Sequence, residues 1–127
     1  MDTPAVTVRY IVEDVSEALS FYTTHFGFSV HQDTAPAFAA IDRGPMRLLL
    51  SASTSAGAKP VLDGRKQEPG SWNRFQIHVS DLAAEVERLK ASGLLFCTEI
   101  REGKGGAQAL LNDPAGNVIE LFQPAPH

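Results

Sequence analysis

The sequence predicts an α+β fold built from two βαβββ modules in one chain. Three observations carry this prediction. Short alternating apolar stretches between turn residues are typical of half-buried strands, and two stretches have the apolar spacing of amphipathic helices. The third observation is a weak internal repeat. When the sequence is aligned with itself at an offset of 67 residues, Val12-Glu13-Asp14 matches Val79-Ser80-Asp81. With 127 residues, the chain has the length of a single domain, so we expect one domain over residues 1–127.

The first module is expected at about residues 5–52. It opens with an alternating strand from Val6 to Val12, followed by an amphipathic helix. Asp14 is the predicted N-cap of this helix, and Gly27 is its predicted stop in the left-handed conformation. Three further strands are expected at 28–32, 38–42 and 46–52.

The second module is expected at about residues 72–123, after a connection at 53–71 that is rich in Ser, Ala, Gly and Pro. A connection of this length is either a lid or a mobile linker, and we favour the linker. A strand from Phe75 to Val79 is followed by a helix capped by Asp81. Three further strands are predicted at 95–100, 107–111 and 118–123, with a glycine-rich turn at 103–106.

Strand alternation predicts which side chains are available to a ligand. Each helix covers one face of its own small sheet, which leaves the other face of each sheet free to line a shared hollow. We expect this lining to be apolar on one side and polar on the other. The predicted ligand-binding residues are Thr7, Arg9, Leu48, Trp72, Arg74, Gln76, His78, Glu120 and Phe122.

Composition excludes several classes of protein. Eleven Lys and Arg against fifteen Asp and Glu give a net charge of −4, without a basic run of the kind that binds nucleic acid or anionic membranes. The single cysteine, Cys97, cannot form an intramolecular disulfide or a Cys-rich zinc site. Neither a signal peptide nor an apolar stretch of membrane-spanning length is present, so we expect a cytoplasmic protein without membrane contact.

A set of motifs carries a resemblance to a known family. The most distinctive is the Asp-Pro-Ala-Gly-Asn turn at 113–117 with the Val-Ile-Glu-Leu strand at 118–121, joined by Val12-Glu13-Asp14 and Phe26-Gly27-Phe28. With these motifs the chain resembles the vicinal oxygen chelate superfamily, which includes glyoxalase I, bleomycin-resistance proteins and extradiol dioxygenases. The resemblance covers nearly the whole chain. It implies paired βαβββ modules that form a curved open barrel, often in a homodimer.

The resemblance also implies where a metal would bind. In metal-dependent members, the corresponding positions are Thr7, Leu48 or its neighbour Leu50, Arg74 and Glu120. Only Glu120 is a competent ligand, whereas a transition-metal site needs three or four donors. We therefore predict no metal site and no cofactor. Because one carboxylate is present, binding of a divalent metal is not excluded by the sequence. Arg74 and Glu120 are predicted to pair with one another; the alternatives are a weak exposed ion pair or two residues that do not meet.

Two functions from different classes remain at this stage. The first is a metal-independent protein that binds a small aromatic or antibiotic-like molecule in the barrel cavity, without making or breaking a bond. The alternative is a glyoxalase-type lyase or dioxygenase, metal-dependent or using Glu120 as a base, Arg74 to stabilise negative charge and His78 as a further candidate. A third hypothesis is an accessory dimer whose hollow has no function. The sequence leaves open whether the protein is an enzyme.

Overall fold

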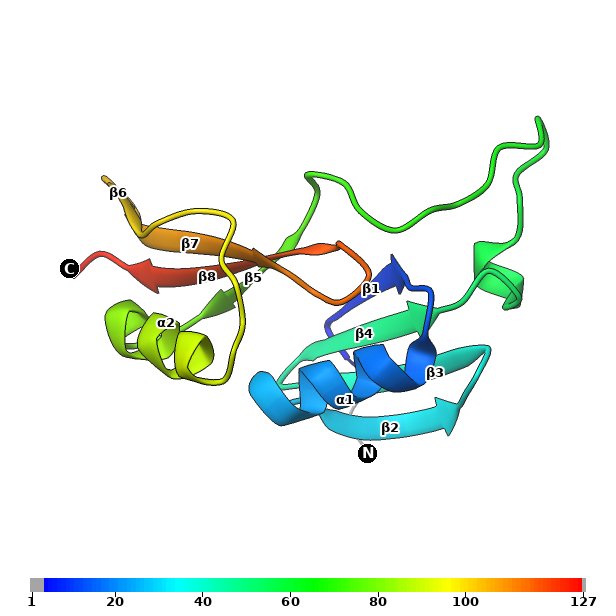
Figure 1. Cartoon of the computed structure of the whole chain (residues 1–127), viewed down its shortest axis with the longest axis horizontal. Coiled ribbons are helices and arrows are strands. Elements are labelled where there is room, and N and C mark those ends of the chain that lie inside the picture. The colour runs from blue at the N-terminus through cyan, green and yellow to red at the C-terminus, as the bar shows by residue number, and fades with distance from the viewer. Residues whose placement is uncertain (1–3, 127) are drawn as a thin grey trace. The chain divides into compact units, whose positions relative to one another are not determined.

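The structure, a computed structural model, describes residues 4–126, which contain two four-stranded sheets (Figure 1). The first sheet contains β1 (Val6–Ile11), β2 (Ser29–Thr34), β3 (Phe38–Arg43) and β4 (Met46–Ser51), and the second contains β5 (Phe75–His78), β6 (Arg101–Gly103), β7 (Gly106–Asn112) and β8 (Val118–Pro124). Their strand orders, β1-β4-β3-β2 and β5-β8-β7-β6, correspond to one another. The predicted α+β class and the duplicated βαβββ pattern are therefore confirmed.

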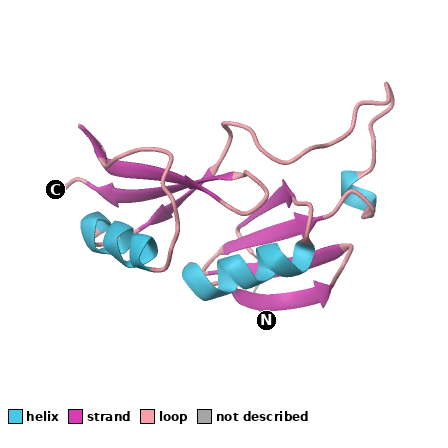
Figure 2. Cartoon of the chain, viewed as in Figure 1, coloured by secondary structure: helices cyan, strands magenta, loops and turns pink. Residues whose placement is uncertain are grey.

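One α-helix accompanies each sheet (Figure 2), α1 (Val15–His25) in the first and α2 (Leu82–Ala91) in the second. Both predicted N-caps are present: the Asp14 carboxylate accepts from the Glu17 N–H and the Asp81 carboxylate from the Ala84 N–H, each at 3.0 Å. Gly27 follows α1 with φ +69°, the left-handed conformation predicted for the helix stop. None of the helices in residues 4–126 is long and apolar enough to cross a membrane.

The register of the first sheet decides which of its side chains are buried. β1 pairs in parallel with β4 and places Val8 beside Leu48, while β3 places Ile41 on the other side of Leu48. Cross-strand neighbours point to the same face of a sheet. Ile41 and Leu48 are fully buried, and α1, which packs on β3 and β4, contributes the buried Tyr22 to the core.

This register corrects the prediction that Leu48, or Leu50, faces a ligand. Both leucines are fully buried on the face that carries Val8 and Tyr10. The alternate residues Arg47 and Leu49 lie on the opposite face, because Thr7 pairs with Arg47 and Arg9 with Leu49. Residues 48–50 are all leucine, so no alternation of polar and apolar residues indicates which face of β4 each side chain occupies.

The outer part of the second sheet also differs from the prediction. Residues 95–100 do not form a strand; they contribute an isolated bridge between Phe96 and Leu111 and one hydrogen bond from the Cys97 N–H to the Leu110 carbonyl at 2.7 Å. The Thr98 hydroxyl accepts the Leu110 N–H at 3.1 Å in place of a backbone carbonyl, which interrupts the ladder. The edge strand is instead the short β6, which includes Gly103 from the predicted turn.

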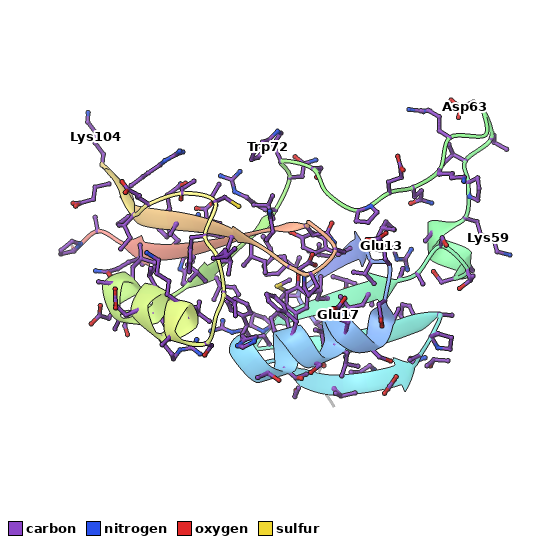
Figure 3. The ribbon with its side chains drawn as sticks, in the orientation of Figure 1. Glu13, Glu17, Lys59, Asp63, Trp72 and Lys104 are labelled. Carbon is purple, nitrogen blue, oxygen red and sulfur yellow. The ribbon has the colours of Figure 1, made fainter. Side chains whose placement is uncertain are left out.

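The described chain divides into two compact units. One extends to Gly70 and includes the turn 114–117, while the other comprises Ser71–Asp113 and the residues from Val118 onward. The connection at 53–70 thus belongs to the first unit, where it forms the 3-10 helix η1 (Ala56–Ala58) and a projecting loop that carries Asp63 (Figure 3). Its end is fastened by the Gly70 N–H, which donates to Asn117 Oδ1 at 2.9 Å.

Candidate functional site

A row of polar and aromatic side chains lies on one face of the second sheet, which we call the polar face of the second unit. β5 pairs in parallel with β8, so that Gln76 is beside Glu120 and His78 is beside Phe122. The intervening residues Phe75 and Ile77 are buried. The alternation of β5 thus brings together four of the predicted site residues, Gln76, His78, Glu120 and Phe122.

Glu120 is the centre of a hydrogen-bond network on this face. Its side chain is only 8% exposed, and Arg74 Nε donates to Oε1 at 2.9 Å. Gln76 Nε2 donates to the second oxygen, Oε2, at 2.7 Å. The predicted Arg74–Glu120 pair is therefore formed. Because the carboxylate is buried and both of its oxygens are bound, the network stabilises a charge that would otherwise be costly to desolvate.

The network extends from Glu120 to an aromatic pair. His78 Nε2 lies 2.9 Å from Gln76 Oε1, so the imidazole is joined to the carboxylate through the Gln76 amide. The His78 ring also packs against Phe122, with centroids 5.4 Å apart and planes tilted by 50°. The face therefore combines an aromatic surface with polar groups in fixed positions.

Trp72 lies at the approach to this network rather than on the strand. The sequence placed it among the inward-facing residues, but β5 begins only at Phe75, and Trp72 is 77% exposed. In Figure 3 its side chain projects away from the strands of its unit. Its carbonyl accepts a hydrogen bond from Arg74 Nη1 at 3.2 Å, so the backbone at Trp72 is held by the same guanidinium that binds Glu120.

The corresponding face of the first sheet carries a different set of groups. Thr7 and Arg9 are both exposed there, as predicted from the alternation of β1. The guanidinium of Arg9 lies against Gly57 of η1, where an added Cβ would overlap it. Arg47 binds the Asp42 carboxylate with two hydrogen bonds, from Nε at 2.7 Å and from Nη2 at 3.0 Å. Because the guanidinium donates two hydrogen bonds to one carboxylate, this bidentate ion pair is of the strong type.

The Asp42–Arg47 pair predicts an acid-sensitive contribution to stability. The hydrogen bonds from Arg47 lower the pKa of Asp42 below its ordinary value of 3.8, with a smaller effect from nearby His31. A depressed folded-state pKa stabilises the fold above the unfolded value and ceases to do so as pH falls through the folded one. We expect the stability difference between wild type and Asp42→Asn to be constant near neutral pH and to shrink below about pH 4.

Urea unfolding of both proteins across this pH range measures the difference. An unchanged gap between them at about pH 3 would contradict the lowered pKa of Asp42.

The residues at the implied metal positions do not fit a divalent cation. Glu120 is the one carboxylate among them, and a cation there would have to displace the hydrogen bonds that hold both of its oxygens and lie beside the Arg74 guanidinium. In the first unit the residue equivalent to Glu120 is Leu49, because Arg9 pairs with Leu49 as Gln76 pairs with Glu120. Residues 4–126 also contain no cluster of three or more His, Cys, Asp or Glu side chains suited to a metal.

The sequence patterns did not identify one further residue of the Glu120 network or the Asp42–Arg47 ion pair of the first sheet. Gln108 Nε2 donates a longer hydrogen bond, 3.4 Å, to Glu120 Oε2 from the neighbouring strand β7. The parity argument applied to β5 and β8 would have found it if extended to β7, because Gln108 pairs with Phe122. The Asp42–Arg47 pair follows likewise from the hairpin register, in which these residues face each other across the 43–46 turn.

The comparison with known families decides the assignment. The sequence matches the Glyoxalase/Bleomycin resistance protein/Dioxygenase superfamily over residues 5–121. The chain belongs to this superfamily. The resemblance carried by the 113–117 turn and the strand after it is thereby confirmed.

The chain is similar to proteins with different descriptions. The uncharacterized protein YurT of Bacillus subtilis is 26% identical over 130 residues, covering 93% of this chain and 97% of YurT. Lactoylglutathione lyase of Pseudomonas putida is 23% identical over 141 residues, covering 91% and 82%. Among solved structures, TnmS3, an antibiotic binding protein from Streptomyces sp. CB03234, has a TM-score of 0.73 at 25% identity, covering 98% and 99%.

Proposed function

We propose that this superfamily member binds a small aromatic molecule at the polar face of the second unit, without a metal and without a chemical step. The observation that supports the proposal is the hydrogen bonding of Glu120. One of its carboxylate oxygens accepts a hydrogen bond from Arg74 and the other accepts one from Gln76. A carboxylate held in this way positions Arg74 and is poorly available as a metal ligand or base. The antibiotic binding described for TnmS3 supports a binding role.

The groups around Glu120 indicate the chemistry of the ligand. The rings of His78 and Phe122 offer an aromatic surface. Arg74 uses Nε for Glu120 and Nη1 for the Trp72 carbonyl, while its Nη2 forms no hydrogen bond within the part of the chain that the structure describes. A guanidinium edge beside aromatic rings suits a flat ligand that carries a carboxylate or phenolate.

Replacing Arg74 tests this proposal. We expect Arg74→Ala to weaken binding of anionic aromatic ligands by about tenfold or more, because one charged hydrogen-bond partner is lost. Neutral analogues of the same ligands should lose much less. Trp72, the only tryptophan of the chain, supplies a fluorescence signal close to Arg74, and thermal shift of the protein is the second readout.

Arg88→Ala is the matched control, because Arg88 also binds a glutamate of the same unit, Glu85 at 2.7 Å, but on the exposed surface of α2. Its affinities should equal those of wild type. Equal losses in the two variants, or no binding by any member of an aromatic acid panel, would refute the proposed site.

A catalytic role is the alternative, and it is favoured by the similarity to Pseudomonas putida lactoylglutathione lyase. Its test is turnover of lactoylglutathione by the purified protein, with and without added divalent metal. Turnover that Glu120→Gln abolishes would replace the binding role with an enzymatic one. A homodimer, which the resemblance implies, is a further expectation, and the molecular mass in solution checks it.

A further inference from the structure

The hydrogen bonds around Glu120 fix the orientation of the Gln76 amide. A carboxylate oxygen can only accept, so the Gln76 atom that lies 2.7 Å from Glu120 Oε2 is its NH₂ group. The other end of the same amide, the carbonyl oxygen Oε1, therefore faces His78. This assignment follows from the network and not from the amide taken by itself.

The orientation of the Gln76 amide in turn determines which ring nitrogen of His78 carries the proton. Oε1 is an acceptor, and it lies 2.9 Å from His78 Nε2, so Nε2 must carry a proton. Neutral imidazole has a single N–H, which leaves a lone pair on the other ring nitrogen, Nδ1. Nδ1 forms no hydrogen bond within residues 4–126, and His78 is exposed. The network thus presents one oriented acceptor beside the Phe122 ring.

We infer that His78 is held as the Nε2–H tautomer and that its Nδ1 selects aromatic ligands bearing an O–H or N–H donor. This inference rests on the proposed binding function and specifies the ligand class. Selectivity is expected because a ligand without the donor would desolvate Nδ1 and leave it unpaired, whereas a donor would satisfy it.

Arg74 and His78, which lie just before β5 and at its end, together define the ligand further. The Arg74 guanidinium binds Glu120, and Glu120 lies beside Gln76, one strand repeat before His78 along β5. A strand repeat of two residues is about 7 Å. The ligand class is therefore an aromatic acid that carries a hydroxyl or amino donor in addition to its carboxylate.

The tautomer is measured directly by ¹⁵N NMR of the imidazole nitrogens in the full chain. We expect the neutral imidazole of His78 to carry its proton on Nε2 and to leave Nδ1 unprotonated. Gln76→Leu should abolish this fixed assignment, whereas Gln108→Leu should keep it, because Gln108 donates to the same Glu120 oxygen and has no hydrogen bond to His78. A neutral His78 ring with its proton on Nδ1 in wild type, or no Nδ1–H population in Gln76→Leu, would overturn the inference.

The ligand preference is measured with 4-hydroxybenzoate and 4-methoxybenzoate, which differ in the O–H donor. We expect the hydroxy acid to bind about tenfold more tightly, and His78→Phe, which keeps a ring and removes the lone pair, to abolish the difference. His25→Phe, at the end of α1 in the first unit, should preserve it.

Three outcomes separate the inference from the proposed function. Equal binding of the two acids to wild type would overturn the selectivity of His78 and leave the binding function standing. Binding of other anionic aromatic ligands but of neither benzoate would overturn the ligand class. A complete lack of binding across aromatic acids would overturn the proposed function and the inference together.

Discussion

Leu48→Ala is expected to lower the free energy of unfolding of the first unit by about 3–5 kcal/mol. Leu48 is fully buried between Val8 and Ile41, so that removing its side chain leaves a cavity that a close-packed core fills only in part. Urea unfolding followed by circular dichroism measures the loss.

Leu49→Ala is the matched control, because it removes the same atoms one residue further along β4. Leu49 is half-buried on the opposite face, beside Arg9 and Ala40. Its loss should cost only about 1 kcal/mol. Equal costs for the two leucines, or a larger cost for Leu49, would show that the register of β1 and β4 is displaced by one residue and that Leu48 faces the polar side.

Glu120→Ala is expected to destabilise the second unit by about 2–3 kcal/mol. The substitution leaves the Arg74 guanidinium, which is 26% exposed, and the Gln76 amide without their shared acceptor. It should also weaken binding of anionic aromatic ligands, because Arg74 is no longer held in place. Urea unfolding and ligand titration of the same preparations check both effects.

Glu85→Ala provides the comparison for this variant. Its partner Arg88 lies 2.7 Å away, but the side chains of the pair are 45% and 34% exposed, compared with 26% and 8% for Arg74 and Glu120. Exposed ion pairs contribute little, so we expect a change of about 0.5 kcal/mol or less. Similar costs for Glu85→Ala and Glu120→Ala would indicate that the Glu120 network is not formed in solution.

Local sequence patterns predicted most of the fold. Asp14 and Asp81 cap the two helices because their side chains can accept the exposed N–H groups of a first helical turn, a requirement that is met within four residues. Strong alternation in Phe75-Gln76-Ile77-His78 fixed the face of β5, and with it the side of the sheet on which Glu120 lies. In these places a single local interaction or period determines the structure.

Prediction failed where the structure depends on a partner strand. The three leucines at 48–50 are apolar on both faces, and only pairing with β1 decides which of them is buried. Residues 95–100 have the composition of a strand, but the Thr98 hydroxyl takes the N–H that a regular ladder would have used. Trp72 lies outside β5 because the strand begins three residues later. The outcomes for the leucines and for residues 95–100 rest on contacts distant in sequence.

The sequence predicted which residues form the candidate site, but it did not predict the hydrogen bonds that Gln76 makes with them. Parity placed Gln76, His78 and Glu120 on one face, but it could not show that the Gln76 amide joins the other two. This bridge matters chemically, because it binds the second oxygen of the carboxylate and orients the imidazole. A pattern of alternating residues contains no information on the rotation of an amide.

We propose that Glu120 serves ligand binding through Arg74 and does not hold a metal. Mass-spectrometric metal content of the purified protein, before and after exposure to Zn, Ni, Mn and Fe(II), tests it most directly. We predict far less than one equivalent per chain in wild type and in Glu120→Gln alike. Close to one equivalent in wild type, lost in Glu120→Gln, would contradict the claim and assign the polar face of the second unit to a metal-dependent enzyme.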